Sequence, residues 1–155
     1  MSFLLTYLSN EAAFSWNSEL ETGIERIDNQ HIKIFKLARN LVTAIADGKG
    51  NDVIMQTLEF LTSYVSKHFS DEERLQAEYN YPDYATHRII HEEFKDKIAK
   101  LAGEIGSEGP SDSLVEEVCV VVSTWLFRHI KGDDFQVAAF IKAEIEERDK
   151  VKLAV

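Results

Sequence analysis

Cysteine and long apolar runs are scarce in this chain, and each absence excludes a class of protein. The 155 residues include one cysteine, so no disulfide can form within the chain. Cys119 lies inside the apolar run 118–122, which predicts a buried, reduced thiol and favours a cytoplasmic location. No stretch reaches the ~20 apolar residues of a membrane span. The short apolar stretch near the N-terminus has no basic region before it, so neither membrane insertion nor a signal peptide is expected.

Clusters of Lys and Arg are also missing. The chain has 17 basic and 27 acidic side chains, a formal charge of −10 and a pI near 4.9. Nucleic acids and anionic membranes attract clustered basic residues, so neither is an expected partner. Apolar residues make up 45% of the chain, which is enough for one well-buried core at this length.

Four stretches carry apolar or histidine residues at helical spacing, separated by short segments rich in turn formers. The predicted helices cover about 24–47, 51–79, 84–105 and 111–132. Glycine in the segment 47–50 can adopt the left-handed conformation that ends the first helix. Asn51 or Asp52 can cap the second helix, the segment 106–110 breaks the third, and Ser111 or Asp112 can cap the fourth.

Gly132 is expected to interrupt or distort the fourth helix, and 135–150 then has helical spacing again. Residues 1–23 have no clear period and are interpreted as an arm anchored by Phe14 and Trp16. We therefore predict an all-α fold, an up-down-up-down four-helix bundle with an N-terminal arm and a short C-terminal helix. The expected single domain 1–155 divides into arm 1–23, bundle 24–132 and C-terminal helix 133–150.

All five histidines lie in register with the apolar stripes of their helices: His31, His68, His87, His91 and His129. Folding the bundle would bring the five imidazoles into one core. Five unpaired buried histidines would be costly to desolvate. A shared metal removes this cost, because the neutral imidazole is the commonest metal ligand in proteins.

Carboxylates accompany these histidines. His87 and His91 are four residues apart and can chelate one ion from adjacent helical turns. His68 and Glu72 have the same spacing. Two bridging carboxylates and five imidazoles are more donors than one ion can hold, which predicts two ions with one position open for a small molecule. Such a nitrogen-rich, carboxylate-bridged set suits iron better than zinc, calcium or manganese.

The carboxylate that follows His129 is ambiguous. Asp133 is at i+4 and Asp134 at i+5. Ideal helix geometry would select Asp133, whereas a locally loosened turn at Gly132 would bring Asp134 around. The spacing alone does not decide between them.

Glu73 and Asp133 each stand beside a candidate ligand. At helical spacing, such a neighbouring position faces solvent more often than it supports a ligand. We therefore expect both to be solvent-facing charges.

The chain resembles the bacteriohemerythrins, the prokaryotic branch of the hemerythrin family, over about residues 14–140. The residues that carry the resemblance are Trp16…Gly23-Ile24…Asp28-Asn-Gln-His31, His68-Phe69-Ser-Asp-Glu72-Glu73, His87-x-x-x-His91 and Trp125-x-x-x-His129-Ile130-x-x-x-Asp134. HxxxH alone is a weak signal, but the combination on four helices is highly specific.

The resemblance implies two iron ions joined by a bridging oxo or hydroxo group. One ion would be held by the residues at His87, His91 and His129, the other by those at His31 and His68, and both by Glu72 and Asp134. It thus selects Asp134 over Asp133 and assigns the open position to the ion with two histidines. An apolar wall around that position is expected from Ile34, Phe35, Phe69, Trp125, Leu126 and Ile130.

The function that the resemblance implies is reversible binding of molecular oxygen at a non-haem di-iron centre, without enzymatic turnover. It would serve oxygen storage, transport or delivery, with an oxygen-consuming enzyme as a candidate recipient. The alternatives are a sensing module for oxygen, redox state or nitric oxide, and a di-iron enzyme acting on peroxide or nitric oxide. The chain lacks the Glu-x-x-His motifs of ferritin-like oxidative enzymes. At this length, the output domain of a sensor is not expected, so a free-standing carrier or store is preferred.

Overall fold

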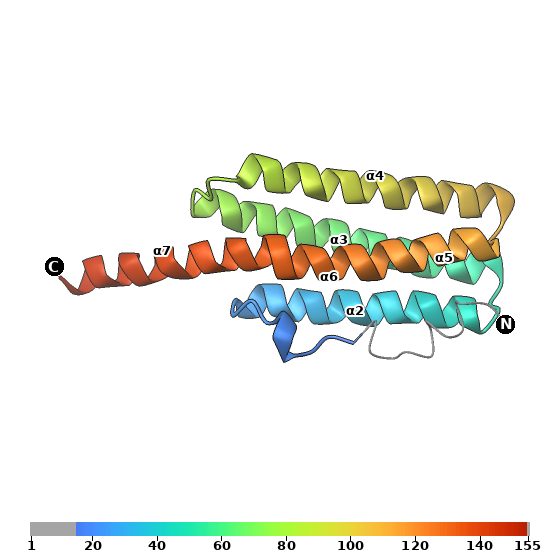
Figure 1. Cartoon of the computed structure of the whole chain (residues 1–155), viewed down its shortest axis with the longest axis horizontal. Helices are drawn as coiled ribbons and strands as arrows, with labels where there is room; N and C mark the ends of the chain where they lie inside the picture. Colours follow the sequence, from blue (N-terminus) through green and yellow to red (C-terminus); the bar gives the residue numbers. More distant parts are fainter. Residues whose placement is uncertain (1–14, 155) are drawn as a thin grey trace.

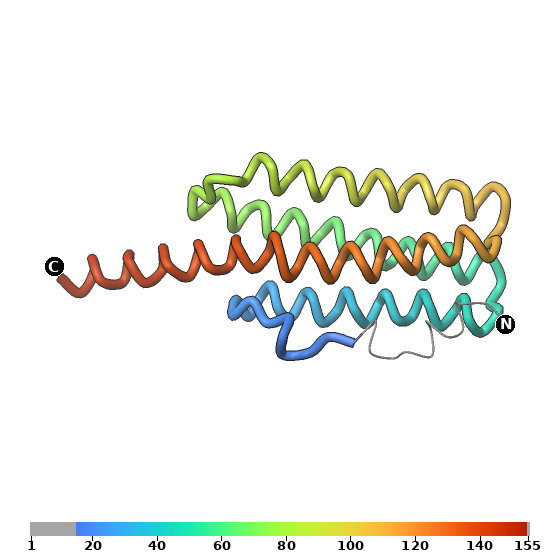
Figure 2. The backbone as a smooth tube through the Cα atoms, in the orientation of Figure 1, coloured from blue at the N-terminus to red at the C-terminus, as the bar shows by residue number. Residues whose placement is uncertain are grey.

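Four helical rods run side by side in the computed structural model, which describes residues 15–154 (Figure 1). The first three rods are α2 (Glu25–Ala46), α3 (Asn51–Glu78) and α4 (Tyr84–Glu108). The fourth rod consists of α5 (Asp112–Val120), η3 (Val121–Trp125), α6 (Leu126–His129), η4 (Ile130–Asp134) and α7 (Phe135–Leu153). The described residues contain no strand. Successive rods run in opposite directions (Figure 2), which confirms the predicted all-α, up-down-up-down bundle.

The apolar stripes of the rods form the core as expected from their spacing. On α2, Ile34, Ala38 and Leu41 are at most 1% exposed. Each is three or four residues from the next, so all three lie on one face of the helix. Matching stripes on the other rods meet this face and form one large buried cluster with it. A second, smaller cluster lies around Tyr81.

The helix ends agree with the sequence prediction at three of four places. Gly48 has the left-handed φ of 62° that ends α2, and the Ser111 hydroxyl accepts a hydrogen bond from Leu114 N at the start of α5. The predicted cap at Asn51 or Asp52 is wrong, because the N-cap of α3 is Gly50 and makes no side-chain hydrogen bond. The predicted break in the segment 106–110 is confirmed, because α4 continues through Gly106 and ends at Glu108. Gly109 follows with a left-handed φ of 83°.

The fourth rod is an unbroken helical path with two π-helical turns, η3 and η4. The expected distortion at Gly132 is η4, and the helix predicted after it is α7. α7 follows η4 directly and ends at Leu153, so the expected boundary between 132 and 133 falls inside a helical turn. Its first half packs on Tyr81 through Val137 and Ile141, and its second half projects beyond the other rods (Figure 1).

Residues 15–24 run along the outside of α2 (Figure 1). Trp16 packs against the core as predicted, whereas Phe14 lies outside the described residues. Asp28 fixes the entry to α2 by accepting hydrogen bonds from Thr22 N at 2.8 Å and Gly23 N at 3.1 Å. None of the helices that the structure describes is long and apolar enough to span a membrane.

Candidate metal centre

The seven side chains predicted as ligands converge inside the bundle, in the half nearer the α3–α4 connection, and none is more than 3% exposed. They come from all four rods: His31 from α2, His68 and Glu72 from α3, His87 and His91 from α4, and His129 and Asp134 from α6 and η4. Because each ligand position belongs to an apolar stripe, the packing that buries the stripes also gathers the polar groups.

The π-helical turn η4 decides which aspartate reaches the cluster. A π turn holds more residues than an α turn, so position i+5 rotates toward the face that i+4 would occupy. Asp134 Oδ1 consequently lies 2.9 Å from His129 Nε2, inside the bundle. Asp133 Oδ2 lies 2.9 Å from Nδ1 of the same ring, on its outer side. Both aspartates therefore contact His129, but on opposite nitrogens.

Two sets of donor atoms are close enough to hold a metal ion. The three-histidine group contains Glu72, His87, His91, His129 and Asp134, and the two-histidine group contains His31, His68 and Asp134.

Asp134 belongs to both groups. Its Oδ1 faces His129 and lies 3.4 Å from His87 Nε2, while its Oδ2 lies 3.1 Å from His31 Nε2. Glu72 Oε2 is 3.4 Å from His91 Nε2 and 3.8 Å from His68 Nε2. Both carboxylates thus lie between the two groups of imidazoles, where a bridging ligand would stand.

The distances between the donor atoms and the lack of hydrogen bonds to the carboxylates fit a bound cation. His91 Nε2 is 3.0 Å from the Nε2 atoms of both His87 and His129. Nitrogens bound at right angles to one ion at ~2.1 Å are about 3.0 Å apart. Both side-chain oxygens of Glu72 and of Asp134 are buried without a hydrogen-bond partner. Buried carboxylates left in this state are costly, and metal coordination satisfies them.

The carboxylates create a strong negative potential at the three-histidine group. Burial lowers the pKa of His87, but Asp134 and Glu72 outweigh it and raise that pKa to about 9. Burial likewise lowers the pKa of His129, but Asp134 and Asp133 raise it to about 10. At His68 burial dominates over Glu72 and lowers the pKa to about 4. A cation that binds to the three-histidine group therefore displaces protons from His87 and His129. In the two-histidine group it meets the neutral imidazole of His68.

The prediction that Glu73 and Asp133 are solvent-facing charges is wrong. Glu73 Oε1 accepts a hydrogen bond from His91 Nδ1 at 2.9 Å, and its side chain is 18% exposed. Asp133 makes the equivalent contact with His129 Nδ1. Helical spacing does not show that a ring on α4 turns its outer nitrogen toward Glu73. The i+4 spacing from His129 did allow the contact made by Asp133. The two bonds direct Nε2 of each ring toward the cluster.

Sequence reasoning missed Gln30, whose Oε1 lies 2.8 Å from His68 Nδ1. The signal was available, because Gln30 lies between Ile27 and Ile34 on the inward face of α2 and is only 7% exposed. A polar residue at such a position usually has a buried partner.

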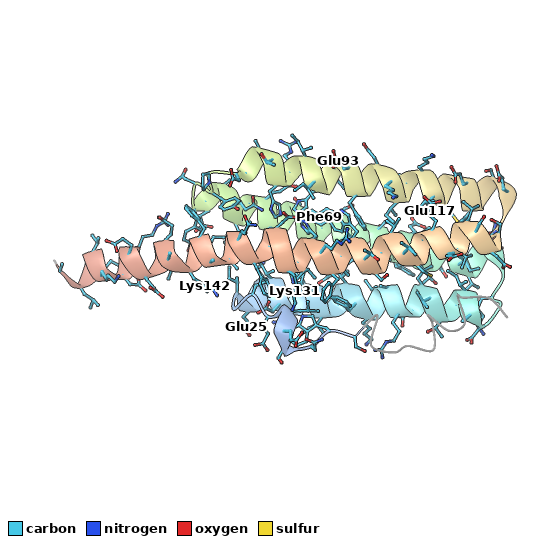
Figure 3. All side chains as sticks on the ribbon, in the orientation of Figure 1. Glu25, Phe69, Glu93, Glu117, Lys131 and Lys142 are labelled. Atoms are coloured by element: carbon cyan, nitrogen blue, oxygen red, sulfur yellow. The ribbon has the colours of Figure 1, made fainter. Side chains whose placement is uncertain are left out.

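Two residues of the predicted apolar wall, Phe69 and Trp125, stack on rings of the three-histidine group. Phe69 lies between the helices (Figure 3) and stacks on His91, with ring centroids 3.8 Å apart. Trp125 stacks on His129 at 4.4 Å. Trp125 is half-buried and therefore covers the three-histidine group from the outside. The other predicted wall residues are buried in the same core: Ile34, Phe35, Leu126 and Ile130.

Comparison with known proteins agrees with this geometry. The family model described as Hemerythrin HHE cation binding domain matches residues 22–141. A bacteriohemerythrin from Stenotrophomonas maltophilia is 30% identical over 88% of this chain and 86% of its own length. A bacteriohemerythrin from Clostridium acetobutylicum is 32% identical over 78% and 95%, and a myohemerythrin from Theromyzon tessulatum is 28% identical over 79% and 89%. The chain belongs to the hemerythrin family.

Proposed function

We propose that this protein binds molecular oxygen reversibly at a non-haem di-iron centre with a bridging oxo or hydroxo group. The observation that carries the proposal is the pair of donor groups that share Asp134 and lie buried inside the bundle. The proposed ligands are His31, His68, Glu72, His87, His91, His129 and Asp134.

The two groups differ in donor number, and this difference suggests separate roles. The three-histidine group would saturate one ion, whereas the two-histidine group leaves its ion a position for a small molecule. Glu72 and Asp134 would join the two ions. When bound, the iron pair supplies the electrons and the open coordination position that dioxygen needs. The chain's own contribution is to hold the imidazoles of His68, His91 and His129 with Nε2 directed inward.

The surroundings of the centre favour reversible binding. Ile34, Phe69 and Ile130 are at most 1% exposed, and the buried apolar packing excludes water and proton donors from the cluster. The donor set contains only two carboxylates, which stabilise high-valent iron less than the carboxylate-rich sites of oxidative di-iron enzymes. Both features support a non-enzymatic carrier or store over an oxidase. We propose that it works in the cytoplasm and supplies an oxygen-consuming enzyme.

Metal analysis and visible absorption spectroscopy test the proposal. The purified protein is expected to contain two irons per chain. After anaerobic reduction it should gain a charge-transfer band when oxygen is admitted and lose that band on degassing. Zinc instead of iron would refute the di-iron assignment. A band that decays to ferric protein within one exposure, or rapid turnover of peroxide or nitric oxide, would favour an enzyme.

A matched pair of variants tests the ligand set. Asp134→Ala removes the carboxylate shared by both groups and should abolish the oxygen-dependent band. Asp149→Ala makes the same chemical change on the projecting half of α7, where the side chain is 62% exposed. It should leave the band and the iron content unchanged. Equal spectra from the two variants would contradict the bridging role.

A further inference from the structure

A buried carboxylate outside the ligand set lies next to the two-histidine group. The Asp71 side chain on α3 is only 6% exposed, yet three cations reach it from the surface. Lys67 Nζ lies 2.7 Å and Arg26 3.2 Å from Asp71 Oδ2, and Arg74 contacts Oδ1. These cations are 60–72% exposed. One side of the Asp71 carboxylate therefore contacts solvent-exposed cations, and the other side faces the core.

The buried side of Asp71 contacts Gln30. Gln30 Nε2 donates a hydrogen bond of 2.7 Å to Asp71 Oδ2. The same amide's Oε1 lies 2.8 Å from His68 Nδ1. The chain Asp71–Gln30–His68, called the relay below, thus connects the surface to one of the proposed ligands through two hydrogen bonds.

The chemistry of the three groups fixes every donor and acceptor in the relay. An ionised carboxylate only accepts hydrogen bonds, so Gln30 must turn its NH₂ group toward Asp71. Its carbonyl oxygen then faces His68 and can only accept, so His68 must carry its proton on Nδ1. The lone pair of the neutral ring is left on Nε2, the nitrogen that faces Glu72. The surrounding cations keep Asp71 ionised and so set this tautomer from outside the core.

We propose that Asp71 and Gln30 are positioning residues that fix the tautomer and orientation of His68, and that they transmit the surface charges of Arg26, Lys67 and Arg74 to the two-histidine group. The positioning of His68 concerns the chain alone. The transmission of charge to a bound metal rests on the proposed function.

The relay makes the two metal positions electronically unequal. His91 and His129 each donate directly to a carboxylate, Glu73 or Asp133, which makes the imidazole a stronger electron donor. His68 instead donates to a neutral amide, and the charge behind that amide is offset by three cations. The proposed oxygen-binding ion therefore receives less stabilisation of its oxidised state than its neighbour.

The positioning of His68 is tested on the metal-free full-length protein by ¹⁵N NMR of labelled histidines. His68 should show a protonated Nδ1 and an unprotonated Nε2. Gln30→Leu, which fills the same space without polar groups, should replace this single form by a mixture of tautomers. An unchanged spectrum in Gln30→Leu would overturn the positioning role.

Zinc titration provides a readout that needs neither iron nor oxygen. Two binding steps are expected in the parent protein, one for each group. Gln30→Leu should weaken one step by roughly 10–100-fold and leave the other unchanged, as losses of outer ligand partners typically do. If Gln30→Leu binds zinc at both steps with the same affinities as the parent protein, the result contradicts the relay. If Gln30→Leu does not fold, Gln30→Met serves in its place, because its side chain is as long as that of Gln and has neither an amide N–H nor a carbonyl.

The reduction potential of the iron-loaded protein tests charge transmission. Asp71→Asn removes the negative charge and should shift the potential to more positive values, whereas Lys67→Gln removes a neutralising cation and should shift it to more negative values. Asp149→Asn is the matched control, since Asp149 also pairs with a lysine, Lys152, at 3.6 Å. Equal potentials in Asp71→Asn and the control would refute transmission. If the protein binds zinc in two steps but its iron-loaded form does not respond to oxygen, the proposed function is refuted and the relay is not contradicted.

Discussion

Phe69 should be among the most sensitive apolar positions in the chain. Its side chain is 1% exposed and stacks on His91 with an interplanar angle of 7°. It also meets Trp125 and Phe94 edge-on, at 5.8 and 5.9 Å between ring centroids. Phe69→Ala removes a buried ring and leaves a cavity, a change that typically costs ~3–5 kcal/mol. The stacked and edge-on contacts add ~0.5–1.5 kcal/mol per pair beyond area alone. We therefore expect the upper half of that range.

Urea unfolding of the metal-free protein, followed by helical circular dichroism, measures this loss. A fall of about 4 kcal/mol in the free energy of unfolding corresponds to roughly 8–16 °C in Tm for a domain of this size. Phe60→Ala is the matched control, because Phe60 lies on the same helix α3 but is 61% exposed. It should change stability by less than ~0.5 kcal/mol. A loss below about 1 kcal/mol for Phe69→Ala would refute tight packing behind His91.

Three further changes probe the site and the core separately. His87→Ala should reduce the iron content below two per chain; full loading with unchanged oxygen binding would defeat its assignment as a ligand. Ile130→Thr places a hydroxyl where the side chain is 0% exposed and should accelerate autoxidation, whereas Val120→Thr, at a position 42% exposed, should not. Burial, and secondarily a nearby carboxylate, raise the pKa of Cys119 to about 11. Its reaction with a disulfide reagent near neutral pH should therefore be very slow until denaturant exposes it, and fast labelling of the folded protein would contradict its burial.

The sequence predicts the bundle well because helical periodicity is a local property. The stripes on α2, α3 and α4 repeat every three or four residues, and the segments that separate them contain glycine or proline. The misplaced cap is an end effect, because α3 begins at Asn51 itself and Gly50 takes the N-cap position. Gly106 lies two residues before the end of α4, and the buried Ile105 anchors that last turn more strongly than one glycine weakens it.

Local helix geometry could not decide whether Asp133 or Asp134 is the ligand. Ideal helix geometry favours Asp133, and only the resemblance selects Asp134. The reason lies in η4, whose π-helical hydrogen bonding rotates Asp134 into the bundle. A glycine at position 132 is compatible with such a turn but does not dictate it, because the turn is stabilised by what Asp134 and His129 meet inside the bundle.

The outer partners of the histidines were missed for a different reason. Glu73 contacts a ring on α4, and Gln30 contacts a ring on α3. Such contacts between rods depend on how the rods are rotated and aligned against one another, which periodicity does not specify. A polar residue on an inward face, as at Gln30, is the sign in the sequence that such a partner exists.

A bundle with this centre loses apolar packing in part of its interior. Seven polar side chains occupy positions that would otherwise hold aliphatic residues, and four of their carboxylate oxygens are buried without hydrogen bonds. Metal ions that bind the folded chain and not the unfolded one offset this cost by mass action, by ~2.7 kcal/mol at a concentration 100 times Kd. The metal-loaded protein should therefore unfold at a higher urea concentration than the chelator-treated protein. The difference should nearly vanish in Asp134→Ala, because that variant loses the carboxylate shared by both groups. Equal midpoints in the unmodified protein would mean that the buried donors are satisfied without a metal.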